Sequence, residues 1–143
     1  GEVDRLAAAI AAVRCRALLT LSVLGRVELA PADPLDAALG AAFDAHQRRV
    51  VSGRRLLGPD APAAAEAALR RHGLAVAVQP SPWRLGPHRA ELTAEWLRGW
   101  VAAAVEQQPD LGEPATSYLR RRLADIAAGR LHAVVGHHDL LAG

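Results

Sequence analysis

The sequence contains no methionine, no lysine and no asparagine, and its 143 residues include a single cysteine, Cys15. One cysteine excludes an internal disulfide and fits a reducing compartment, and we expect Cys15 to be an inert buried residue. No apolar run approaches the roughly 18 residues that cross a bilayer, and no basic segment leads into an apolar one as in a secretory signal. These absences favour a cytoplasmic protein without a membrane partner.

The lack of methionine also bears on where translation begins. The chain starts at Gly1, so we do not expect it to be a complete translated product. Either a tag or N-terminal part has been removed, or the chain is a fragment of a larger protein. The strand pattern described below favours the fragment.

The composition is that of a domain with a hydrophobic core. Hydrophobic residues make up 51% and charged residues 22%, which excludes a disordered tail, and the length fits one ordinary domain. All 17 basic residues are arginines, yet the formal net charge is only +2. Acidic residues separate the arginine pairs and aromatic residues amount to 3%, so solvated helix faces are favoured over a nucleic-acid partner.

Several catalytic signatures are missing. The chain has no GxGxxG or GxxxxGK[ST] phosphate loop and no GxSxG nucleophile motif. The C-terminal residues His132, His137, His138 and Asp139 suggest metal ligands at first sight. Adjacent histidines on a strand point to opposite faces, however, and no CxxC or HExxH motif completes a ligand set, so we expect no metal.

Hydrophobic periodicity predicts five helices and three strands. The helices are expected at residues 3–13, 33–50, 60–73, 87–107 and 115–128. The strands are expected at residues 17–23, 74–78 and 131–135, with a short extended piece at 27–29. Asp33 and Pro34 are typical of a helix start, and the arginines at 120–122 are expected to face mostly outward.

The strand at residues 17–23 is apolar on both faces, which is typical of a strand inside a sheet with a neighbour on each side. Three strands cannot give every strand two neighbours. We therefore expect the missing neighbours to lie N-terminal to Gly1.

Residues 81–84 leave the end of a predicted strand without helical periodicity. In open α/β sheets, ligands bind at the C-terminal ends of the strands. Trp83 and Arg84 could therefore pack on and hydrogen-bond a substrate, and a turn with a packed tryptophan is the equal alternative. His46, on the helix after the first strand, could face either this crevice or solvent.

Several stretches together resemble one bacterial branch of the class I S-adenosylmethionine-dependent methyltransferases. The similarity covers nearly the whole chain, although no single stretch is a catalytic signature. The stretches are Ala-Leu-Leu-Thr-Leu-Ser-Val (17–23), Gly-Arg-Val-Glu-Leu (25–29), Pro-Ala-Asp-Pro-Leu-Asp (31–36), Ala-His-Gln-Arg-Arg (45–49), Arg-Leu-Leu-Gly-Pro-Asp (55–60), Ser-Pro-Trp-Arg-Leu (81–85), Glu-Trp-Leu-Arg-Gly-Trp (95–100) and Val-Val-Gly-His-His-Asp-Leu-Leu (134–141).

The resemblance implies an α/β fold, the C-terminal part of a Rossmann-like seven-stranded sheet with the strand order 3-2-1-4-5-7-6 and an antiparallel last strand. Residues 1–143 would then be a single partial domain with helices on both faces of strands five to seven. A helical pair at residues 86–129 would be inserted before the last strand. The fourth strand of the family would supply the missing neighbour.

The resemblance also implies that S-adenosylmethionine is bound by the N-terminal half of the domain, so no cofactor-binding residue is assigned in this chain. Strands five and six would run parallel and present their C-terminal ends to the cofactor. The candidate substrate contacts are then Arg26, His46, Trp83 and Arg84, with the inserted helices as a possible lid. No catalytic base is identified, since such enzymes often act by proximity and orientation.

We therefore expect the C-terminal part of a methyltransferase for a small-molecule acceptor, inactive by itself. Its partners would be that acceptor and the missing N-terminal half, or a second copy paired through residues 17–23. The alternative is a non-enzymatic α/β interaction or regulatory module that uses the helix of Trp96 and Trp100 as a partner groove. Both tryptophans are, however, more typical of core anchors.

Overall fold

The computed structural model describes residues 1–143, with the exception of the side chain of Leu21. The helices are α1 (Glu2–Val13), α2 (Asp36–Gln47), α3 (Ala61–Arg71), α4 (Ala90–Gln107) and α5 (Gly112–Ala127). The strands are β1 (Ala17–Ala30), β2 (Val50–Val51), β3 (Arg54–Arg55), β4 (Val76–Pro80), β5 (Trp83–Leu85) and β6 (His132–Ala142). Three short 3-10 helices, η1 (Gly58–Asp60), η2 (Pro87–Arg89) and η3 (Pro109–Leu111), precede α3, α4 and α5. The fold is therefore α/β.

The main sheet is built around β6, the last strand. Its order is β1-β6-β4, and β5 also pairs with β6 on the side away from β1. All of these pairings are antiparallel, so β1 and β4 run parallel to each other on either side of β6. The pairing of β1 with β6 shifts register twice, between Leu19 and Ser22 and between Val23 and Val27.

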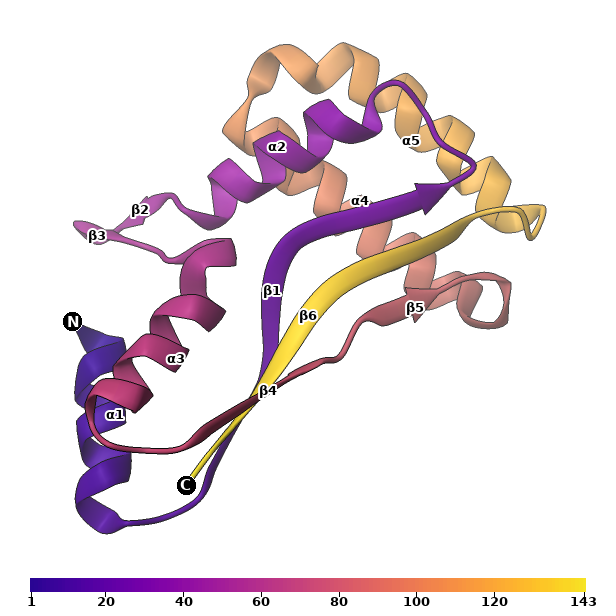
Figure 1. Ribbon diagram of the computed structural model, residues 1–143. Helices are drawn as coiled ribbons and strands as arrows, with labels where there is room; N and C mark the ends of the chain where they lie inside the picture. Colours follow the sequence, from indigo (N-terminus) through magenta and orange to yellow (C-terminus); the bar gives the residue numbers. More distant parts are fainter.

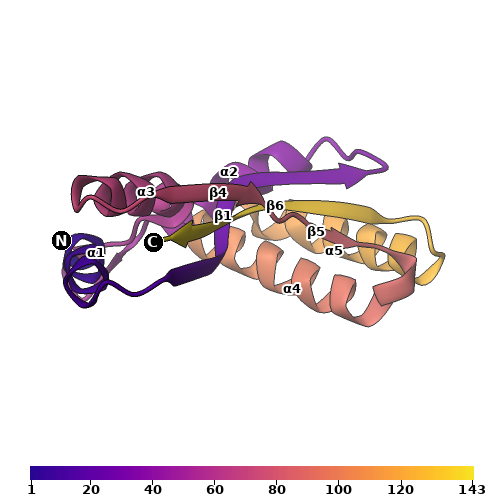
Figure 2. The same cartoon turned by 60° about the horizontal axis from the view of Figure 1, so that its bottom comes forward.

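Two groups of helices cover the two ends of this bent sheet (Figure 1, Figure 2). Near the C-terminus, α1 packs on α3, and a cluster that includes Ile10, Leu69 and Ala142 forms between them and the sheet. At the other end, α2 and α5 both pack on α4 around Leu39, Leu97 and Tyr118, among other buried residues. These two clusters, with a smaller one of Leu85, Ala133 and Val135 on β5 and β6, form the core of the molecule.

The strand β1 lies at the edge of the sheet, although it is rich in apolar residues. None of its described side chains is fully buried. Leu18 is 64% exposed, and Leu141, its register partner on β6, is 46% exposed. One face of the sheet at this end is therefore open and apolar.

The helices agree with the sequence pattern to within a few residues. Asp33 begins a turn rather than the helix itself, because its Oδ1 accepts a hydrogen bond from the Leu35 amide and α2 starts at Asp36. Gly73 has the left-handed conformation expected after α3, with φ +80°. The helix α4 follows Pro87 by way of η2 and extends to Gln107.

The strand predictions need four corrections. The strand expected at 74–78 is β4 at Val76–Pro80, so it includes Pro80, which was expected to end it. β1 continues to Ala30 because the expected extended piece at 27–29 pairs with β6 as well. β6 is longer than residues 131–135, because residues 136–142 pair with β1 and β4 rather than forming a tail. Trp83 and Arg84 lie in the short strand β5, not in a turn.

Two side-chain predictions are wrong. Cys15 is exposed, because it lies in the short connection between α1 and β1 and not on either element. Arg122 does not face outward with its neighbours: only 2% of its side chain is exposed. Its NH1 donates to the Pro31 carbonyl oxygen at 2.7 Å and its NH2 to both oxygens of Asp36 at 2.8 Å.

Tyr118 completes this buried cluster. Its hydroxyl donates to Asp36 Oδ1 at 2.7 Å, and the Arg122 guanidinium lies 5.2 Å from the centre of its ring. Burial, together with the hydrogen bond to the Asp36 carboxylate, raises the pKa of Tyr118. Burial alone would lower the pKa of Arg122, but the hydrogen bonds with Asp36 and Tyr118 outweigh it, and the pKa is raised. The cluster therefore holds α5 to the start of α2, with the Arg122 guanidinium and the Asp36 carboxylate both charged.

The two tryptophans of α4 pack inward, as expected. Trp100 is 2% exposed, Trp96 packs against the same core, and their rings stack at 5.7 Å. Trp100 is therefore a core residue, and Trp96 is partly buried beside it. No helix among the described residues is both long enough and apolar enough to cross a bilayer.

Candidate functional site

A cavity of about 460 Å³ lies between the C-terminal half of β1 and helix α2, and we refer to it as the β1–α2 cavity. Its volume is within the range of small-molecule sites. Helix α4 closes one side with Trp100. The lining residues are Gly25, Arg26, Val27, Glu28, Leu29, Asp36, Ala37, Gly40, Asp44 and Trp100.

Gly25 permits the close approach of β1 to α2 at this cavity. Its φ is +67°, a conformation that side-chain-bearing residues rarely adopt. A Cβ atom at this position would lie only 2.6 Å from Asp44 Oδ2. The backbone conformation therefore favours glycine here, and the absence of a side chain leaves room for the Asp44 carboxylate beside it.

Asp44 is the most unusual polar group of the cavity. Its side chain is half-buried, and within the described part of the chain no donor hydrogen-bonds to its carboxylate and no cation lies within ion-pair distance. Burial raises the pKa of this carboxyl, as does the neighbouring Asp60, while Arg48 acts in the opposite direction. An unpaired carboxylate held partly out of water favours the binding of a ligand donor or cation.

Trp100 contributes a second unpaired group. Its indole Nε1 is buried and has no hydrogen-bond acceptor among the described residues. A Cβ atom on Gly40 would lie 3.8 Å from Trp100 Cζ2, so the six-membered ring of the indole lies beside α2, while Nε1 itself is shielded from solvent. Buried indole N–H groups ordinarily find an acceptor.

The structure distributes the four predicted substrate contacts over different places. Arg26 lines the β1–α2 cavity. Trp83 and Arg84 lie on the opposite side of β6, where they pair with Val135 and Val134. The Trp83 ring stacks on His137 at 4.8 Å and the residue is 39% exposed, so it is a partly packed side chain at the sheet surface.

His46 faces away from this cavity, toward the end of α4. It is 8% exposed, and its Nε2 lies 3.3 Å from Glu106 Oε2, although the two atoms are not aligned for a hydrogen bond. Arg49 donates to the His46 carbonyl oxygen at 3.0 Å. The sequence left open whether His46 faces the crevice or solvent. It faces neither, because its side chain lies at the packed boundary between α2 and α4.

Sequence reasoning did not single out Asp44, nor did it place Trp100 in the wall of a cavity. In the sequence, Asp44 is an acidic residue two positions before His46 on the same helix. An acid at such a position has the same pattern as one on a solvent-exposed helix face. Only the approach of Gly25 reveals that this carboxylate is partly enclosed.

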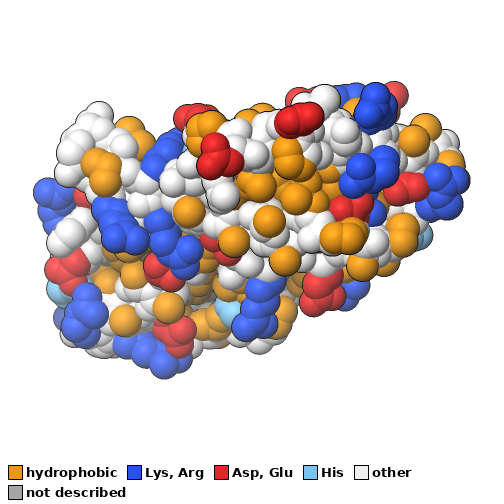
Figure 3. Space-filling view, turned by 90° about the horizontal axis from the view of Figure 1, so that it is seen from above, with side chains coloured by type: hydrophobic (Ala, Val, Ile, Leu, Met, Phe, Trp, Pro, Cys, Tyr) orange, Lys and Arg blue, Asp and Glu red, His pale blue; other side chains and the backbone are white. Residues whose placement is uncertain are grey.

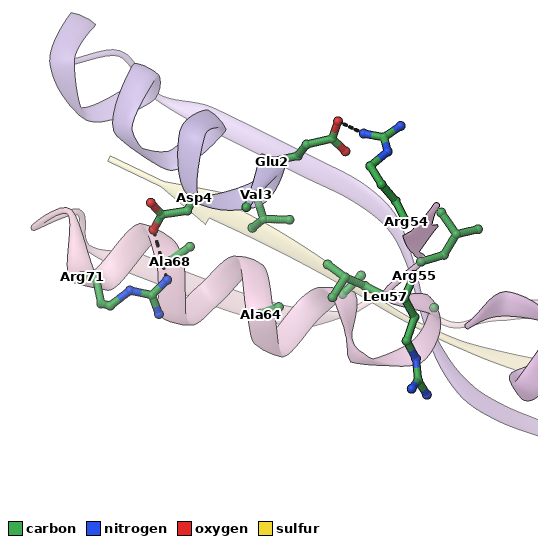
Figure 4. Close-up of a pocket in the computed structure, with 13 residues that line it drawn as sticks. Glu2, Val3, Asp4, Arg54, Arg55, Leu57, Ala64, Ala68 and Arg71 are labelled. Carbon is green, nitrogen blue, oxygen red and sulfur yellow. Dashed lines mark hydrogen bonds and ion pairs between the residues drawn. The ribbon is translucent and has the colours of Figure 1, made fainter. Parts of the chain in front are cut away.

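A second cavity, of about 610 Å³, lies between α1, α3 and the β2–β3 hairpin (Figure 4). Val3, Leu57 and Ala64 are among its apolar lining residues. Four of its five charged side chains are already paired: Arg54 binds Glu2, and Arg71 lies 3.2 Å from Asp4. Arg55 points away from Val3. None of the four predicted substrate contacts lines this cavity.

The face of the molecule seen from above gives no further indication of a charged partner. Figure 3 shows acidic and basic side chains intermixed around hydrophobic patches on the face seen from above, without a large area of one sign. Among the described residues, no group of three or more His, Cys, Asp or Glu side chains is placed to hold a metal ion.

The partly buried Asp44 carboxylate leads to a prediction about stability. Because the pKa of Asp44 is raised in the folded state, ionisation of this carboxyl lowers the free energy of unfolding. This loss of stability is absent below the ordinary pKa of aspartate, and it develops as the pH rises through the raised pKa. Asp44→Asn should therefore raise Tm at pH 7 by about 2 °C, and this gain should vanish near pH 3. Thermal unfolding of both proteins between pH 3 and 8 tests it; an equal gain at every pH would contradict the electrostatic cause.

Comparison with known proteins adds no relative. No protein-family model matches the chain, and no curated protein and no solved structure matches it significantly.

Proposed function

We propose that this chain is the C-terminal, substrate-side part of a class I S-adenosylmethionine-dependent methyltransferase domain that methylates a small molecule. The support comes from the order and direction of the strands. β6 lies between β1 and β4 and is antiparallel to both. The resemblance implies the same arrangement for strands five, seven and six of such a domain, in which the last strand is inserted between its two predecessors.

The open edge of β1 also supports the proposal. An apolar strand with a free edge and an exposed leucine, Leu18, is prone to association with other chains. A neighbouring strand on the free edge, as strand four of the family, would satisfy the backbone groups of β1. Covering the face that holds Leu18 and Leu141 would remove a further apolar surface from water.

The described residues do not fit S-adenosylmethionine by themselves. The connections after β1 (31–35) and after β4 (81–82) contain no glycine-rich loop that could approach the cofactor closely. The proposal therefore assigns cofactor binding to the N-terminal half of the domain. This chain would contribute the β1–α2 cavity, in which the acceptor is held, and the inserted helices α4 and α5, which close that cavity from one side.

Calorimetric titration with S-adenosylhomocysteine tests this proposal. We expect heat of binding with the longer protein encoded by the gene, including the region upstream of Gly1, and none with residues 1–143 alone. Tight binding by the 143-residue chain would contradict the placement of the cofactor site. Absence of binding by both proteins would contradict the methyltransferase itself and favour an interaction module.

A further inference from the structure

Three arginines from two separate parts of the sequence line one cavity beside the β2–β3 hairpin, which follows the end of α2 (Figure 1). The cavity measures about 580 Å³, and we refer to it as the arginine cavity. It shares no lining residue with the β1–α2 cavity. Its lining residues are Ala41, Ala45, Arg48, Arg49, Val50, Arg55 and Gln107.

The charge of this lining is positive, because it contains three arginines and no acid. One of these charges is balanced: Arg48 donates from Nε and NH2 to the two carboxylate oxygens of Asp60, at 2.8 and 2.9 Å. Neither Arg49 nor Arg55 forms an ion pair with a described carboxylate. Glu106, which precedes Gln107, does not line the cavity, and its Oε2 lies 3.3 Å from His46 Nε2. Two positive charges therefore remain, which favours a ligand with two negative charges.

Contacts within the protein hold Arg49 in place. Its NH1 donates to the His46 carbonyl oxygen at 3.0 Å and lies 3.3 Å from His46 Nδ1. Its backbone is fixed as well, since the Leu56 amide donates to the Arg49 carbonyl oxygen at 3.0 Å. The Nε and NH2 groups of Arg49 have no acceptor in the described part of the chain. A guanidinium that is already positioned loses little conformational freedom when it binds an anion.

Arg55 supplies the other unpaired guanidinium. Its side chain extends away from Val3, out of the cavity between α1 and α3 (Figure 4). Its register partner across the hairpin is Val50, and directly opposed residues of an antiparallel pair project from the same face. Val50 is 65% exposed, so Arg55 lies beside an apolar side chain that is open to a ligand.

The remaining walls fit an organic group. Ala41 and Ala45 lie one turn apart on an exposed part of α2, and with Val50 they form an apolar surface. The guanidinium group donates pairs of parallel N–H bonds to phosphate oxygens. A phosphate monoester carries close to two negative charges at neutral pH, which matches the two unpaired arginines.

We propose that the arginine cavity binds a small organic phosphate, whose phosphate oxygens accept from Arg49 and Arg55 while its apolar part packs on Ala41, Ala45 and Val50. This site lies apart from the β1–α2 cavity, so the proposal does not depend on the proposed function.

Phenyl phosphate, benzoate and phenol provide matched probes, because they share a phenyl ring and carry two, one and no negative charges at pH 8. Calorimetric titration of the 143-residue chain at pH 8 and low salt should give tighter binding of phenyl phosphate than of phenol by at least about tenfold, since hydrogen bonds between charged groups are the stronger ones. Benzoate should fall between them. Equal affinity for phenyl phosphate and benzoate, or no binding of phenyl phosphate, would overturn the proposal.

Arginine variants locate the phosphate. Arg49→Gln and Arg55→Gln should each weaken phenyl phosphate binding by about tenfold. Arg120→Gln removes the same charge from an exposed arginine outside the lining and should leave the affinity within about twofold, because distant exposed charges are screened. Arg55 is exposed in a two-residue strand, so its replacement tests the site without disturbing the core. Equal losses in Arg55→Gln and Arg120→Gln would show a general attraction to a basic protein and overturn the site.

A second pair of variants locates the apolar part. Ala45→Leu fills the arginine cavity and should weaken phenyl phosphate binding, whereas Ala38→Leu, exposed on the same helix but outside the lining, should not. Unchanged affinity in Ala45→Leu would place the ligand elsewhere. None of these outcomes bears on S-adenosylhomocysteine binding by the longer protein, so the two proposals can fail separately.

Discussion

Replacing Arg122 with methionine should lower the free energy of unfolding by about 3 kcal/mol, because removal of one partner leaves the other charge of a buried ion pair uncompensated. The variant leaves the Asp36 carboxylate with two uncharged donors, the Tyr118 hydroxyl and the Asp33 amide, and it leaves the Pro31 carbonyl oxygen without the guanidinium. Methionine fills much of the same space, so the loss reports the polar contacts rather than a cavity. Urea denaturation of both proteins at pH 7 measures this difference in the free energy of unfolding.

Arg121→Met is the matched control on the same helix. Arg121 also binds an aspartate, with its NH2 2.9 Å from Asp33 Oδ2, but its side chain is 55% exposed. Exposed ion pairs contribute little, so we expect a loss of less than about 1 kcal/mol. Equal losses in the two variants would show that the Arg122 cluster is no more important than a surface pair.

The second large effect is expected at Gly58, which lies in the segment joining the β2–β3 hairpin to α3. Its φ is +52°, and a Cβ atom there would lie 2.9 Å from both the carbonyl carbon and the oxygen of Gln47. Backbone atoms cannot move aside as a side-chain end can. Gly58→Ala should therefore cost about 2 to 4 kcal/mol, the sum of the left-handed conformation and the steric overlap.

Gly53→Ala separates these two contributions. Gly53 has a similar φ of +75°, but nothing lies within 4 Å of the position of its Cβ. We expect a loss of about 1 to 2 kcal/mol from the backbone conformation alone. Chemical denaturation of both variants gives the steric part as the difference, and a Gly58→Ala loss no greater than that of Gly53→Ala would show that the end of α2 shifts to accept the methyl group.

The candidate site was only partly accessible to sequence reasoning. Arg26 was identified and lines the β1–α2 cavity. The sequence grouped three more residues with Arg26 because each follows or accompanies a strand end: Trp83, Arg84 and His46. In the structure, β6 separates Trp83 and Arg84 from Arg26. The packing of α2 on α4 directs His46 away from the cavity. Asp44 was missed because an acid in a helix has the same local signal whether solvent or a strand lies beside it.

The sequence by itself determined the helices, the α/β class and the apolar character of β1, because these depend on the spacing of hydrophobic residues and on the glycines and prolines that limit each element. Tertiary structure decided what local patterns do not encode. The pairing of residues 136–142 with two strands extended β6 beyond its hydrophobic part. The meeting of α5 with α2 buried Arg122, although the two arginines before it, Arg120 and Arg121, are exposed. The approach of Gly25 to α2 enclosed Asp44. In each case the partner is distant in the sequence, and only the folded chain brings it into contact.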